Sequence, residues 1–134
     1  MSVALLALAL SFSEAAATSP LSVATGNWDN IPAIERRGEQ GFEFFDMQGV
    51  DAALTNECSK RQRRNQPIDV DIPFLVEFAP DNSVRRVVVQ RLDCPAAEQI
   101  IGSAVLRLAK SGEFRPTGEN QTGWYRGQFT MTSR

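Results

Sequence analysis

The residue types that most often carry chemistry are sparse in this chain. It has two cysteines, Cys58 and Cys94, and no histidine. The lack of histidine excludes Ser-His-Asp and Cys-His nucleophile activation and the usual zinc ligand sets. The sequence also has no glycine-rich phosphate loop. We therefore expect no enzyme activity, no cofactor, no metal site and no small-molecule substrate.

Two further patterns each allow a chemical interpretation and a simpler one without chemistry. Asp69 and Asp71 alternate along one face of a predicted strand, where a pair of carboxylates can divide acid and base roles. No third polar group is spaced to join them, so we interpret them as a solvated sheet face. The triplet Asn120-Gln121-Thr122 matches a glycosylation acceptor, but such triplets are frequent by chance.

The N-terminus has the pattern of an export signal. An apolar run from Val3 to Leu10 is followed by Ala15-x-Ala17. The run is too short to cross a bilayer, which needs about 20 apolar residues, and small residues at this spacing suit a signal peptidase. We predict that residues 1–17 are a signal peptide and that the protein is periplasmic. The alternative is an uncleaved segment that tethers the protein to the inner membrane.

Export decides how the cysteines are interpreted. An oxidising compartment permits a disulfide, and a Cys58–Cys94 bond leaves no thiol over. The competing interpretation is a free thiol near a helix start that acts as a nucleophile, but it lacks a base. We therefore predict the disulfide.

Composition bounds the partners and the number of domains. A hydrophobic fraction of 43% and a charged fraction of 22% are ordinary for a globular protein, and a net charge of -2 gives no reason to expect nucleic acid. The exported chain of roughly 115 residues is long enough for one two-layer core. We predict an irregular leader over 18–40 and a single domain over 41–134.

The first half of the chain predicts one helix. Residues 18–26 show no periodicity, and the apolar cluster of Phe42, Phe44 and Phe45 fits a short strand or a packed loop. From Val50, apolar residues recur at helical spacing up to Cys58. A basic cluster follows and suits a helix C-terminus or contact with an anionic surface: Lys60, Arg61, Arg63 and Arg64.

The second half predicts a hairpin, a helix and a closing strand. Alternating apolar residues define strands over 70–78 and 84–91, joined by a turn in which Asn82 suits a left-handed conformation. Pro95 opens a helix with a continuous apolar stripe, and Gly112 ends it. A short extended piece over 114–116 precedes a strand over 124–132. We expect an α+β fold in which a small antiparallel sheet of about three strands packs two helices on one face.

This order resembles the C-terminal domain of TonB, the periplasmic energy transducer that engages outer-membrane receptors. The resemblance covers about half of the chain. It rests on Val70-x-Ile72-x-Phe74 with Phe78, the hairpin Asp81-Asn82-Ser83-Val84-x-x-Val87-x-Val89, Leu92-Asp93 before the helix, Phe114-x-Pro116, and the strand Trp124 to Met131. Unlike the energy-transducing members, the sequence shows no uncleaved membrane helix, no Pro-rich spacer, and no Tyr-Pro pair before the first helix. The resemblance therefore implies a free-standing, divergent member.

In the family, a receptor peptide adds as an extra strand at the sheet edge. The equivalent edge here is the strand over 124–132. Tyr125, Phe129 and Met131 should face the core, so the side chains predicted to meet a partner are those of Trp124, Arg126 and Gln128. Gly127 leaves the backbone open to close approach. An unpaired edge also invites aggregation, so the protein should either use it or shield it by forming a dimer.

Three classes of function follow, in decreasing order of support. The first is a periplasmic TonB-like interaction module that binds an extended peptide of an envelope protein, which links it to TonB-dependent outer-membrane transport. The second is a secreted structural or inhibitory domain stapled by a disulfide. An enzyme comes last. An exposed, unpaired last strand would favour the first class over the second.

Overall fold

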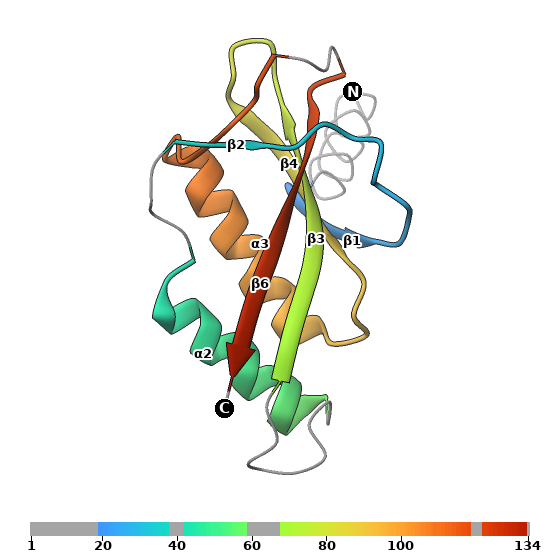
Figure 1. Cartoon of the computed structure of the whole chain (residues 1–134), viewed down its shortest axis with the longest axis vertical. Helices are drawn as coiled ribbons and strands as arrows, with labels where there is room; N and C mark the ends of the chain where they lie inside the picture. The colour runs from blue at the N-terminus through green and yellow to red at the C-terminus, as the bar shows by residue number, and fades with distance from the viewer. Residues whose placement is uncertain (1–18, 38–41, 59–67, 119–121, 134) are drawn as a thin grey trace, which may run out of the picture.

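The computed structural model describes residues 19–37, 42–58, 68–118 and 122–133. A four-stranded sheet in the order β1-β4-β3-β6 packs the helices on one face (Figure 1). The predicted α+β class is confirmed. The elements are β1 (Leu21–Ala24), β2 (Glu35–Arg36), α2 (Phe44–Ala52), a π-helical turn η1 (Ala53–Glu57), β3 (Ile68–Phe78), β4 (Val84–Gln90), α3 (Pro95–Lys110), β5 (Phe114–Arg115) and β6 (Trp124–Ser133).

The predicted hairpin and closing strand form the centre of the sheet. β3 pairs antiparallel with both β4 and β6. Asn82, in the turn between β3 and β4, has a φ of 69°, as its type allows. Pro73 lies on β3 just beyond the last residue paired with β4, which is Phe74. The missing N–H of Pro73 therefore costs no bond to β4.

The prediction of an irregular leader over 18–40 was wrong, and so was the purely antiparallel sheet. Leu21–Ala24 form β1, which pairs parallel with β4 and makes the sheet mixed, and Glu35–Arg36 form β2, which pairs with β5. The Leu21 side chain packs against Gly102 of α3, where a Cβ atom would overlap it. β1 has only four residues and takes its place through this distant contact, so its own sequence carries no clear period.

The first helix begins earlier than predicted. It starts at Phe44 rather than Val50, and the helical path ends with η1. Glu43 is the N-cap, and its N–H donates to Asp46 Oδ2 at 3.1 Å. The Phe44–Phe45 pair therefore lies in a helix, not in a strand or loop. The predicted basic cluster of residues 60–64 lies outside the described residues.

The second helix follows its sequence signals. Cys94 is the N-cap, Pro95 opens the helix, and Gly112 follows its end with a φ of 86°. Its apolar stripe packs on the sheet, which confirms the predicted core face. The core residues with under 2% of their surface exposed are Val50, Phe74, Val76, Val87, Val89, Cys94, Ala97, Ile101, Ala104, Val105, Tyr125 and Phe129.

The predicted disulfide is present. Cys58, just after η1, is bonded to Cys94 at the start of α3, with their Cα atoms 5.7 Å apart. A second link joins the same two helices, because Arg107 Nη2 donates to Asp46 Oδ2 at 2.7 Å. This bond raises the pKa of Arg107. The helices are thus fixed to each other at two points.

Within the described residues, no helix is both long and apolar enough to cross a membrane.

Candidate functional site

β6 lies at the edge of the sheet, as the interaction hypothesis requires. Its strand neighbour in the sheet is β3. Along an antiparallel strand, the N–H and C=O of successive residues point alternately toward and away from the neighbouring strand. Arg126 exchanges backbone bonds on the side away from β3, so the backbone groups of Gln128, Thr130 and Thr132 also point outward. We call these three residues the β6 edge.

The start of β6 is covered by the chain's own N-terminal segment. Residues 28–34, here called the strap, run from β1 at one edge of the sheet to β6 at the other, across the face opposite the helices (Figure 1). The Arg126 N–H donates to Pro32 O at 2.8 Å, and the Ile34 N–H donates to Arg126 O at 2.7 Å. The strap therefore closes the edge at Arg126. Among the described residues, no further backbone bond of this kind extends the cover along the β6 edge.

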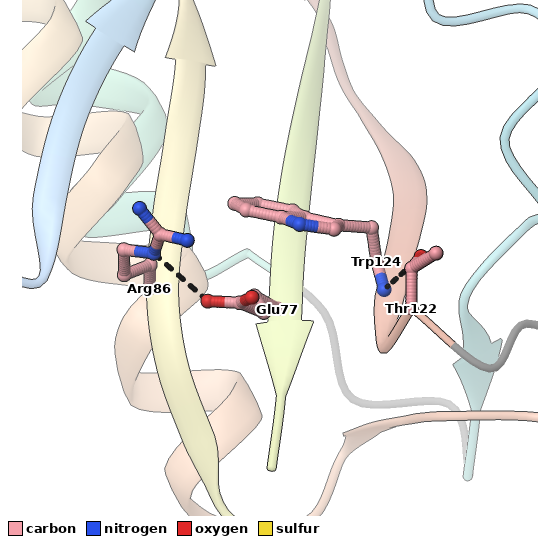
Figure 2. Close-up of polar contacts among 4 residues, drawn as sticks. All are labelled: Glu77, Arg86, Thr122 and Trp124. Carbon is pink, nitrogen blue, oxygen red and sulfur yellow. Dashed lines mark hydrogen bonds and ion pairs between the residues drawn. The ribbon is translucent and has the colours of Figure 1, made fainter.

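Two of the three predicted partner residues make contacts within the chain. Trp124 lies next to Glu77 in the register of β6 and β3, and Glu77 lies next to Arg86 in the register of β3 and β4. Arg86 Nε donates to Glu77 Oε1 at 2.8 Å, which raises the pKa of Arg86. The Arg86 guanidinium also lies 5.1 Å from the Trp124 ring centroid. Figure 2 shows the indole reaching across β3 toward this ion pair, and the backbone N–H of Trp124 donates to Thr122 Oγ1 at 3.4 Å.

Arg126 and Gln128 differ in how they are engaged. The Arg126 side chain is half-buried, and its Nε donates to Ile31 O at 3.3 Å, so both its backbone and its side chain hold the strap. Gln128 is exposed, and its backbone groups belong to the β6 edge. All three side chains share the face opposite the helices. Of the three, Gln128 lies where a new strand can pair.

The structure gives a packing reason for a glycine at position 127, and the sequence did not reveal it. Gly127 lies opposite Phe74 in the register of β3 and β6, and a Cβ atom there would overlap the Phe74 ring. The space left by the missing side chain is therefore filled by the protein's own core on the helix side of the sheet. Gly127 serves the packing of Phe74, whereas the sequence suggested an opening for a ligand.

A pocket of about 290 Å³ lies where the strap leaves β6. Its apolar lining includes the rings of Phe42, Phe74 and Phe114, which pack against one another with centroids 5.6 to 6.2 Å apart. Ile34, Gly127 and Gln128 also line it. We call this the end pocket, because it adjoins the closed end of the β6 edge. No sequence signal pointed to it, since its residues come from five separate segments.

In the part of the chain that the structure describes, the other candidate sites bring no set of catalytic side chains together. Asp69 and Asp71 are exposed and lie opposite Thr132 and Thr130 in the sheet register. A hollow of about 690 Å³ at the C-terminal end of α3 has no cysteine and only one carboxylate in its lining, and that carboxylate, Glu35, is paired with Arg115 at 2.9 Å. Within the ranges that the structure describes, no acidic or cysteine cluster is suited to a metal ion.

Comparison with known proteins gives no family assignment. No family model, no curated protein and no solved structure matches this chain. The strongest feature of the chain's own geometry is the β6 edge with its closed end. The glycosylation triplet falls partly in residues 119–121, outside the described residues.

Proposed function

We propose that this protein is a periplasmic TonB-like interaction domain that binds an extended peptide of an envelope protein by strand addition at the β6 edge. The observation that carries the proposal is the outward row of backbone groups at Gln128, Thr130 and Thr132. A sheet edge of this kind offers main-chain hydrogen bonds to an incoming strand. The class of partner that the resemblance implies is a segment of an envelope protein such as an outer-membrane receptor.

The three predicted contact residues have distinct roles in this proposal. Gln128 supplies backbone groups to the partner strand. Trp124 and Arg126 present side chains on the face opposite the helices, beside the closed end of the edge. Export through residues 1–17 and residence in the periplasm are parts of the same proposal, and residues 1–18 lie outside the described residues.

The test removes one outward donor without touching the ladder to β3. Proline is tolerated at a sheet edge when its nitrogen faces away from the neighbouring strand, so a Gln128→Pro variant should fold. The partner strand would lose the hydrogen bond donated by the N–H of residue 128, and the carbonyl that accepted this bond would be left unpaired. We expect affinity for the partner isolated from an envelope extract to fall about tenfold or more.

A Gln128→Ala variant is the matched control, because it removes the side chain and keeps the N–H. It should bind within about twofold of the wild type. Calorimetric titration of the three proteins with the same isolated partner decides the matter. If the proline variant binds the partner as tightly as the wild type, strand addition at this edge is excluded. If both variants lose affinity to the same extent, the side chain of Gln128 makes the contact.

The disulfide supports a second candidate, a secreted structural or inhibitory domain. The Cys58–Cys94 bond and the strap both hold the domain rigid, which suits a structural or inhibitory role. This candidate predicts that the β6 edge has no ligand and that the proline variant keeps every activity of the wild type.

A further inference from the structure

The β6 edge is a short groove with one closed end. From Gln128 to Thr132 the edge extends about 14 Å, at about 3.4 Å per residue. At the Arg126 end, the strap takes the backbone positions that a longer partner strand would need. A strand added here must therefore end or turn away beside Gln128. The end pocket lies at that point.

The end pocket has the size and lining of a site for one apolar side chain. Its volume of about 290 Å³ is at or below the low end of the range of small-molecule pockets, which begins at about 300 Å³. Phe42, Phe74 and Phe114 give it aromatic walls, and Ile34 and Ala33 close it on the side of the strap. A single aliphatic or aromatic side chain would exchange water for these surfaces on binding.

The charge of the same pocket is positive. Arg36 and Arg126 line it, and its lining includes no carboxylate. The Arg36 guanidinium lies 5.9 Å from the Phe114 ring centroid, so the cation sits beside the aromatic wall. Guanidinium groups recognise carboxylates through paired hydrogen bonds.

We infer that the β6 edge binds the C-terminal segment of a partner chain, with its last side chain, an apolar one, in the end pocket and its terminal carboxylate against Arg36. This inference rests on the proposed function and adds the class of peptide. The peptide runs antiparallel to β6, because its C-terminus must lie at the Gln128 end. A chain terminus requires a groove with a closed end, and here an apolar pocket and the Arg36 cation lie at that same end.

A second copy of the chain fits these features less well. Two copies joined through β6 about a twofold axis would pair their edges around Thr130. Such a pairing places Ser133 of each copy opposite Gly127 of the other, at the end pocket, and a residue as small and polar as serine leaves the aromatic walls of that pocket largely uncovered. It is therefore treated as an outcome of the test.

Two random heptapeptide libraries separate the possibilities. One displays each heptapeptide at a free C-terminus, and the other places the same heptapeptides inside a longer chain. We expect the immobilised whole protein to enrich the first library, with large apolar residues at the last position. Enrichment of the internal library alone would overturn the inference and keep strand addition. Enrichment of neither library, or enrichment of this chain's own β6 sequence, would overturn both.

The selected peptide then tests the carboxylate directly. Its free acid should bind about tenfold or more tightly than its C-terminal amide. An Arg36→Gln variant should reduce that ratio to within about twofold of one, and a control variant Arg85→Gln, whose exposed arginine lies on β4, should keep it. Gln128→Pro should weaken both peptide forms. An acid-to-amide ratio near one in the wild type would overturn the role of the terminal carboxylate.

Discussion

Removal of the Cys58–Cys94 disulfide should destabilise the protein by about 4 kcal/mol. The bond closes a loop of 36 residues in the unfolded chain. In the chain-entropy description, releasing a loop of that length returns about 13 cal/mol/K to the unfolded state, which at 25 °C is about 4 kcal/mol. Total stabilities of single domains are about 5 to 15 kcal/mol. The loss would therefore be a large share of the stability of this domain.

The measurement compares urea denaturation of the wild type with that of a Cys58→Ala, Cys94→Ala double variant. The midpoint should fall, and the slope should rise because the unfolded chain becomes less compact. Wild type under reducing conditions is the control that keeps both sulfur atoms in place. A double variant within about 1 kcal/mol of the oxidised wild type would refute the entropic argument for this loop.

Two further predictions concern single contacts. A Gly127→Ala variant should lose about 1 to 3 kcal/mol in thermal or urea denaturation, because the added Cβ overlaps the Phe74 ring. The same substitution should cost less in a Phe74→Leu background, and an unchanged stability would contradict the overlap. Ser83 donates to Asp81 Oδ1 from its hydroxyl at 2.6 Å and from its N–H at 3.0 Å, and these bonds lower the pKa of Asp81. A Ser83→Ala variant should raise that pKa toward its ordinary value in an NMR titration. The pKa of Asp81 in the folded protein lies below that in the unfolded chain. The stabilisation that these bonds give is therefore fully present above the unfolded pKa and is lost as the pH falls through the folded pKa. An Asp81 titration midpoint that does not move in the Ser83→Ala variant would contradict this assignment.

Local sequence patterns predicted the elements that depend on local chemistry. The alternation in β3 and β4, the turn at Asn82, and the proline and glycine that bound α3 each act within a few residues. Two cysteines without a competing ligand, together with the expected export to an oxidising compartment, predicted the disulfide. These features follow from the sequence because each depends on few distant contacts.

The features that the sequence did not predict depend on distant contacts. β1 is placed by the packing of Leu21 against Gly102, far along the chain. Phe45 obscured the start of α2 because it is 79% exposed, which breaks the apolar period of that helix. At the candidate site, the spacing of Trp124, Arg126 and Gln128 correctly placed them on one face. It could not show that the strap already bonds Arg126.

The strap also has a consequence for the order in which the protein folds. Pro32 and Ile34 bond Arg126, so residues separated by most of the chain must meet for the strap to dock. Closing so long a loop costs more entropy than forming the β3–β4 hairpin, whose strands are joined by a short turn. Arg126 presents its outward groups only after β6 has paired with β3. We therefore expect the segment that is synthesised early to dock last, so that the newly folded sheet first exposes the whole length of β6.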